Sequence, residues 1–179
     1  LARVNTMSER VSSHDRFGLL QGFMGSLERV PSRPALHVGG TFFTYETLGR
    51  IAGAIAGTIT ESDQGDHPLV ALLAHRSLSA YAGVLGILRS GRGYVPINPK
   101  LPRERQLRIL AESQTRVVLV GTEAWRILQD MAPKLPGTYT ILCLDLDEEG
   151  KGSLEAGPHR ILRVNTMAGA PDPDRRSVQ

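Results

Sequence analysis

The chain has 179 residues, of which 41% are hydrophobic, and a formal net charge of +3 at pH 7, as expected of one domain or one large subdomain with a single core. Its densest basic cluster, between Lys100 and Arg108, lacks the aromatic partners and the reading motif of a nucleic-acid-binding protein. No apolar run approaches the ~20 residues of a membrane helix, and residues 1–15 lack the apolar core of a secretory signal. The lone Cys143 cannot form an internal disulfide, which fits a reducing compartment. Together these features lead us to expect a cytoplasmic protein with no membrane or nucleic-acid partner.

The first predicted elements are a helix and a hairpin. Apolar residues recur at helical spacing over 16–30, which predicts an amphipathic helix. Two short runs at 35–38 and 41–45, joined by two glycines, predict a tight antiparallel hairpin. Thr44 can then cap the next helix, where Glu46 complements the positive helix end.

A second helix is predicted over 48–59, because its apolar residues keep helical spacing for three turns. Gly49, Gly53 and Gly57 form a further stripe on this helix, although each glycine lowers helix propensity by about 1 kcal/mol relative to alanine. In a membrane such a stripe indicates helix pairing. Arg50 interrupts this short segment, so we interpret the stripe as close packing of a water-soluble helix.

From residue 68 onward, strands and helices alternate. The continuous apolar run Pro68–Ala74 is typical of a strand buried on both faces. The helix that follows Ser77 has almost no polar face, so we expect it to be buried and to end at Gly91. The remaining elements are strands over 94–97, 117–120 and 138–144 and helices over 102–113 and 122–131. This alternation predicts an α/β fold with a mostly parallel sheet flanked by helices.

The two ends differ in composition from the centre of the chain. We divide the sequence into a flexible N-terminal segment, 1–15, an α/β subdomain, 16–146, and a flexible C-terminal tail, 147–179. The tail has few apolar residues and many Gly and Pro residues, so little of it can offset the entropy of ordering. Within the tail, Ile161–Val164 has the apolar residues needed to dock.

Two segments resemble the first two signature motifs of the adenylate-forming enzymes, the AMP-dependent synthetases and ligases. They are Thr41–Leu48 and Leu88–Leu110, and the resemblance extends over roughly 17–146. This superfamily includes the adenylation domains of nonribosomal peptide synthetases and the acyl-CoA ligases, and the chain is similar to the first N-terminal subdomain of that fold. The positions that match are Tyr45, Glu46, Leu48, Leu88, Gly91, Gly93, Tyr94, Pro96, Asn98, Pro99, Pro102, Glu104 and Arg105.

The resemblance implies that the complete enzyme joins a carboxylic or amino acid to ATP, with magnesium, to give an acyl adenylate. Coenzyme A or the phosphopantetheine of a carrier protein then takes the acyl group. The family's phosphate loop, rich in Ser, Thr and Gly and ending in Pro-Lys-Gly, is absent from these residues, so no catalytic, cofactor-binding or metal residue is carried over. We expect the chain alone to be inactive and to bind no cofactor. Asn98 stands where many amino-acid-activating members have Asp, which leaves the acid substrate open.

Other candidate sites are weaker. Gly91 and Gly93 lead into a strand and not into a helix, unlike a dinucleotide loop. His75 follows a buried strand, at the edge where open α/β sheets bind ligands, but a surface loop histidine is the alternative. Cys143, in an apolar strand without an adjacent base, is predicted to be an inert buried thiol. The acidic residues over 145–149 match no calcium loop, and the scattered histidines predict no zinc site.

Two other classes of function remain open. The chain can be a non-catalytic remnant of such an enzyme that serves as an interaction module, or a basic nucleic-acid-binding domain. Its expected partners are the remainder of the synthetase or a second copy of itself. A strong salt dependence of DNA or RNA binding would distinguish the nucleic-acid class from the others.

Overall fold

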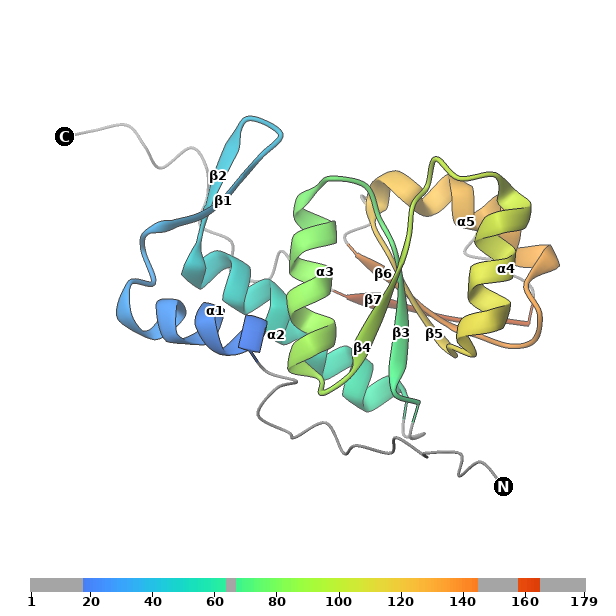
Figure 1. The fold of residues 1–179 in the computed structure, drawn as a ribbon, viewed down its shortest axis with the longest axis horizontal. Helices are drawn as coiled ribbons and strands as arrows, with labels where there is room; N and C mark the ends of the chain where they lie inside the picture. The colour runs from blue at the N-terminus through green and yellow to red at the C-terminus, as the bar shows by residue number, and fades with distance from the viewer. Residues whose placement is uncertain (1–17, 64–66, 145–157, 165–179) are drawn as a thin grey trace, which may run out of the picture.

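The computed structural model describes residues 18–63, 67–144 and 158–164 (Figure 1). No helix in these ranges combines the length and hydropathy that a membrane crossing requires. The elements in chain order are α1 (Gly18–Arg29), β1 (Pro34–Val38), β2 (Thr41–Thr44), α2 (Tyr45–Ser62), β3 (Leu69–Leu73), α3 (Leu78–Arg89), β4 (Gly93–Ile97), α4 (Arg103–Ser113), β5 (Val117–Val120), the 3₁₀ turn η2 (Thr122–Ala124), α5 (Trp125–Met131), the 3₁₀ turn η3 (Ala132–Lys134), β6 (Thr140–Leu144) and β7 (Arg160–Val164).

Within the described ranges, five parallel strands form the central sheet in the order β4-β3-β5-β6-β7. The helices α2 and α3 cover one face of this sheet, and α4 and α5 cover the other (Figure 1). Successive residues of β3 alternate between the two cores: Val70 and Leu72 pack with α2 and α3, whereas Ala71 and Leu73 pack with α4 and α5. The predicted α/β fold with a parallel sheet between helices is therefore confirmed.

The hairpin and the start of α2 form where local sequence predicts them. Strands β1 and β2 pair antiparallel through Gly39 and Gly40, whose φ angles of 59° and 77° favour residues without a Cβ. The Thr44 hydroxyl accepts a hydrogen bond from the backbone N–H of Thr47 at 3.2 Å, which satisfies a free donor at the start of α2. In Figure 1 the hairpin stands apart from the main sheet, beside α1 and α2.

Glycines allow close approach at two contacts between helices. A Cβ on Gly49 of α2 would lie 2.7 Å from the Leu27 side chain of α1. A Cβ on Gly86 of α3 would lie 2.5 Å from the Ile55 side chain of α2. At Gly57 the corresponding position has no described atom within 4 Å. At Gly53 a Cβ would lie 3.3 Å from the Arg89 guanidinium of α3. The packing role predicted for the glycine stripe therefore holds at Gly49 and Gly53 and not at Gly57.

The helix α3 is half-buried, which corrects the prediction of a buried helix. Its buried residues face α2 and the sheet, and they are Ala82, Gly83, Gly86 and Ile87. Tyr81, on the other side of the helix, is 43% exposed. The reason is that α3 lies over β4, an edge strand of the described sheet. The helix ends as predicted, before Gly91, whose φ is 80°.

Strand β7 places part of the predicted tail in the sheet. Arg160–Val164 pairs in parallel with β6, and Val164 is buried. The docking that Ile161–Val164 allows therefore occurs, and the predicted boundary at residue 146 does not hold for this strand. Residues 1–15 and the rest of the predicted tail lie outside the described residues, apart from the turn that leads into β7.

His159 anchors the start of β7. Its Nδ1 accepts a hydrogen bond from the backbone N–H of Tyr139 at 3.2 Å, and its Nε2 donates to the carbonyl of Ala132 at 3.0 Å. A neutral imidazole with its proton on Nε2 satisfies both contacts. Through these two direct hydrogen bonds, the buried His159 links the loop before β6 to the start of β7.

Replacing His159 by alanine is expected to lower the free energy of unfolding by about 2 kcal/mol, because it leaves the buried N–H of Tyr139 without an acceptor. The Ala132 carbonyl also loses one donor, although it keeps the N–H of Leu135. Chemical denaturation measures this loss, and amide hydrogen exchange should show β7 opening before the rest of the sheet. The matched control is His37→Ala on the exposed hairpin, where we expect a change within about 0.5 kcal/mol. Equal losses in the two variants would contradict the anchoring role of His159.

Candidate functional site

A cavity of about 500 Å³ opens beside the carboxyl ends of β3 and β4. Its mainly apolar lining comes from α3, β4 and the loops that follow β3 and β4. The lining residues are Leu72, Ala74, His75, Arg76, Ala80, Tyr81, Val84, Tyr94, Pro96, Ile97, Asn98 and Leu101. Ligands of open α/β sheets bind outside the carboxyl ends of the strands. This cavity is therefore the candidate functional site.

The turn after β4 forms one wall of the cavity and is held by Gln106 of α4. The Gln106 side chain is fully buried, and its Nε2 donates to the carbonyls of Asn98, Pro99 and Leu101 at 3.1, 3.0 and 3.0 Å. The Asn98 side-chain oxygen accepts a hydrogen bond from the backbone N–H of Lys100 at 2.9 Å. These contacts position Asn98 and Leu101 in the wall.

A second set of contacts holds the loop after β3 at the mouth of the cavity. Glu123 of η2 accepts hydrogen bonds at Oε1 from the backbone N–H of His75 at 2.8 Å and from the Ser77 hydroxyl at 2.7 Å. The same hydroxyl caps α3 by accepting from the N–H of Ala80 at 3.3 Å. Glu123 thus ties the loop after β3 to the end of β5.

Gln106 and Glu123 are both absent from the predicted site residues. Glu123 lies 46 residues from Ser77 in the sequence, so no local spacing indicates their contact. Gln106 is a polar residue in the buried stripe of the amphipathic helix α4, and that position is the one signal that the sequence offers.

The first sequence motif lies away from the cavity. Tyr45 begins α2, and its ring centroid is 5.7 Å from that of Phe23 on α1. Leu48 is buried in the core between the sheet and the helices α2 and α3, and Glu46 is exposed in the first turn of α2. These three residues join α1, the hairpin and α2, so their placement is structural.

The second motif surrounds β4, and part of it reaches the cavity. Its members in the lining are Tyr94, Pro96 and Asn98. Gly91 follows the end of α3, and Gly93 begins β4, where a Cβ would lie 2.9 Å from the Leu69 side chain. Pro102 and Arg105 lie at α4 and line a separate hollow on the surface of that helix.

The other candidates behave as isolated groups. His75 lines the cavity at the carboxyl edge of the sheet and is exposed. Cys143 is buried in β6 as predicted, and burial raises the pKa of its thiol to about 12, which Arg163 opposes only in part, so the neutral thiol is favoured. The acidic run over 145–149 lies outside the described residues. Within the described ranges, no group of three His, Cys, Asp or Glu side chains could hold a metal ion.

The composition of the cavity suits binding or packing and does not fit ATP with magnesium. Its polar side chains are His75, Arg76 and Asn98, set in an otherwise apolar wall with the phenol groups of two tyrosines. The described lining contains no carboxylate, whereas magnesium takes oxygen ligands, usually including one or two carboxylates. A magnesium–ATP complex at this site would therefore need carboxylates from outside the described lining.

Comparison with known proteins identifies the family. The model of the AMP-binding enzymes matches residues 23–176. The chain is 33% identical over 133 residues to surfactin synthase subunit 3 of Bacillus subtilis (strain 168), an alignment that covers 74% of this chain and 10% of that protein. The chain thus spans about a tenth of the length of this relative.

Solved structures show the same fold. The Vibrio cholerae adenylation domain AlmE, in complex with glycyl-adenosine-5'-phosphate, matches with a TM-score of 0.69 at 16% identity, over 93% of this chain and 30% of that chain. The nonribosomal peptide synthetase FmoA3, in its α-methyl-L-serine-AMP-bound form, matches with a TM-score of 0.62 at 26% identity, over 80% of this chain and 15% of that chain. Together with the family match, these similarities show that the chain belongs to the AMP-binding, adenylate-forming enzymes and corresponds to the N-terminal part of such an enzyme.

Proposed function

We propose that this chain is the N-terminal scaffold of an enzyme that uses ATP to convert an amino acid into an aminoacyl adenylate and then transfers it to a thiol. The observation that carries this proposal is the family match over residues 23–176. The similar synthetase that holds α-methyl-L-serine-AMP supports an amino acid as the substrate. The thiol would be the phosphopantetheine of a carrier protein or coenzyme A.

In this proposal the chain supplies a wall and not the reaction centre. The cavity beside β4 has no carboxylate in its described lining, so ATP and magnesium would be held by the rest of the enzyme. Gln106 and Glu123 would keep the two loops of the wall in place. Their role would be to preorganise a surface against which the catalytic part closes.

The face formed by α3 and β4 is the part of the chain that we propose the rest of the enzyme covers. Tyr81 and Tyr94 on this face are 43% and 38% exposed. The N–H of Gly93 donates inward to the carbonyl of Pro68, so by alternation the backbone of residues 94 and 96 points outward. Pro96 has no N–H, which removes a donor from this edge and disfavours an added strand. Side-chain packing is therefore the expected mode of contact.

The test compares this 179-residue chain with a longer protein expressed from the same gene. We expect no amino-acid-dependent exchange between pyrophosphate and ATP from the chain alone, and clear exchange from a longer product that includes the family's phosphate loop. Tyr94→Lys in the longer protein should reduce exchange by about tenfold or more, because it places a charge in an apolar contact. The matched control, Phe42→Lys on the hairpin, should leave exchange unchanged.

Two results would contradict the proposal. Micromolar ATP binding or exchange by the chain alone would show that the reaction centre lies within it. A longer protein that contains the phosphate loop and activates no amino acid would refute the assigned reaction. Full exchange in the Tyr94→Lys variant would instead remove this face from the contact and leave the reaction intact.

A non-catalytic interaction module is the second candidate, and the same exposed face favours it. Without other domains, a second copy of the chain could cover Tyr81 and Tyr94, and a two-fold dimer is the commonest arrangement. A stop codon after Gln179, together with a dimer in light scattering that Tyr94→Lys dissociates, would support this candidate. A strictly monomeric chain at high concentration would exclude it.

A further inference from the structure

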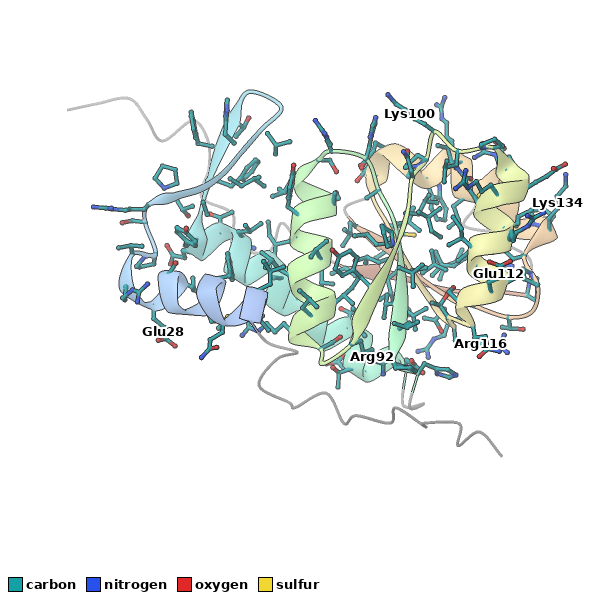
Figure 2. All side chains as sticks on the ribbon, viewed as in Figure 1. Glu28, Arg92, Lys100, Glu112, Arg116 and Lys134 are labelled. Atoms are coloured by element: carbon teal, nitrogen blue, oxygen red, sulfur yellow. The ribbon has the colours of Figure 1, made fainter. Side chains whose placement is uncertain are left out.

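A second cavity lies at the opposite, amino edge of the sheet. It has a volume of about 470 Å³, within the range of small-molecule pockets. Arg116, labelled in Figure 2, and Tyr139 line the cavity and directly precede β5 and β6, and His67 lies shortly before β3. Leu110 of α4 and Pro136 contribute apolar surface. The lining therefore combines cationic and hydroxyl groups with an apolar wall.

The Tyr139 side chain is the first group that points to a ligand. Tyr139 is 3% exposed, and its backbone N–H and its ring are both engaged with His159. Its hydroxyl donates no hydrogen bond to any residue in the described ranges, although the residue lines the cavity. Burial raises the pKa of this phenol, and the positive charge of Arg116, which lines the same cavity, opposes the rise.

Arg116 is the second such group. Its backbone carbonyl accepts a hydrogen bond from the N–H of Thr140 at 2.8 Å, and its Nη1 lies 3.1 Å from the position that a Cβ on Gly137 would occupy. The side chain thus packs over a glycine whose φ is 99°. Among the residues that the structure describes, no carboxylate lies within 4.0 Å of this guanidinium, so its charge is available to a ligand.

His67 also lines the cavity and is half-exposed. Its Nδ1 lies 3.2 Å from a carboxylate oxygen of Asp63, which brings a negative charge near this site. That carboxylate also forms an ion pair with Arg92, which offsets its repulsion of an anion. The remaining polar lining comes from Gln114 and Thr115. The charge of the lining itself is positive.

We propose that this cavity binds a small organic anion. The oxyanion group would contact the Arg116 guanidinium and accept a hydrogen bond from the Tyr139 hydroxyl, and the apolar part would lie against Leu110 and Pro136. A carboxylate and a phosphate monoester share this chemistry. The site lies at the edge of the sheet opposite to the candidate functional site, so it does not depend on the proposed adenylation function.

The proposal is tested by titrating the isotope-labelled full chain in NMR at constant ionic strength. The probes are benzoate, phenyl phosphate, inorganic phosphate and the neutral benzamide. We expect saturable shifts of the amides around residues 114–116 and 137–140 with benzoate or phenyl phosphate. The probe that binds more tightly shows whether the site prefers a carboxylate or a phosphate monoester. Benzamide and inorganic phosphate should each bind about tenfold more weakly, because one lacks the charge and the other lacks the apolar part.

Variants distinguish a built site from general attraction of anions. Arg116→Gln and Tyr139→Phe should each weaken binding by about tenfold, since each removes one donor to a charged group. The matched control Arg105→Gln, an exposed arginine on α4, should not change it. The amide spectrum of each variant reports whether the fold is kept, and Tyr139→Phe retains the buried ring. Equal binding of benzamide, unchanged binding in Arg116→Gln, or shifts spread over the arginines of α4 would overturn the proposal.

Discussion

Replacing Gln106 by leucine is expected to lower the free energy of unfolding by about 3 kcal/mol, because backbone carbonyls packed against this buried side chain lose its N–H donor while the side-chain volume is nearly conserved. Gln106 is fully buried, and its Nε2 donates to the carbonyls of Asn98, Pro99 and Leu101. In the variant the carbonyls of Pro99 and Leu101 face a methyl group, whereas the carbonyl of Asn98 keeps the backbone N–H of Leu101. The turn must move for the first two carbonyls to reach water, and the wall of the cavity moves with it.

Urea denaturation measures the loss, and amide shifts of residues 98–101 report whether the turn has moved. At this chain length the expected loss corresponds to a fall in Tm of roughly 6–12 °C. The matched control is Gln129→Leu on the exposed side of α5, for which we expect a change within about 0.5 kcal/mol. If Gln106→Leu were as stable as the parent chain, the turn would be held by its own backbone and not by this side chain.

Gly86→Ala and Gly57→Ala are expected to change stability in opposite directions, although both place the same methyl group in a helix. At Gly86 the new Cβ would lie 2.5 and 2.6 Å from two atoms of Ile55 and 3.1 Å from the carbonyl oxygen of Ala52. The β-branched Ile55 cannot rotate away easily, so α2 and α3 must separate. We expect a net loss of about 2 kcal/mol at this site, after the gain in helix propensity is counted.

At Gly57 no described atom lies within 4 Å of the new methyl group. The substitution should therefore stabilise the chain by about 0.5–1 kcal/mol, the propensity difference between glycine and alanine. Thermal unfolding of the two variants beside the parent chain measures both effects. A stabilising Gly86→Ala would mean that the contact between α2 and α3 is looser than these distances indicate.

The local parts of the fold could be predicted from sequence because their causes are local. Two glycines with positive φ make the hairpin turn, and a threonine before Tyr45 caps α2. The continuous apolar run of β5 is found at 117–120, as predicted. The alternation of strands and helices was enough for the parallel sheet, since right-handed crossovers leave few other arrangements. The family resemblance rested on the same segments.

Which surfaces are buried, and which side chains hold the candidate site, was decided by the tertiary structure alone. Whether α3 is buried depends on β4 being at the edge of the sheet, and strand order is a property of the whole chain. Strand β7 docks because β6 offers a free edge and because His159 ties the start of β7 to the residue before β6. The short apolar run of β7 by itself did not ensure this docking.

The contacts that hold the candidate site are of the same kind. Glu123 reaches Ser77 across 46 positions, and Gln106 becomes important only when a turn folds back over it. Sequence spacing records neighbours along a helix or a strand. It carries no record of the partners that packing brings together, because those contacts form only when distant elements lie side by side.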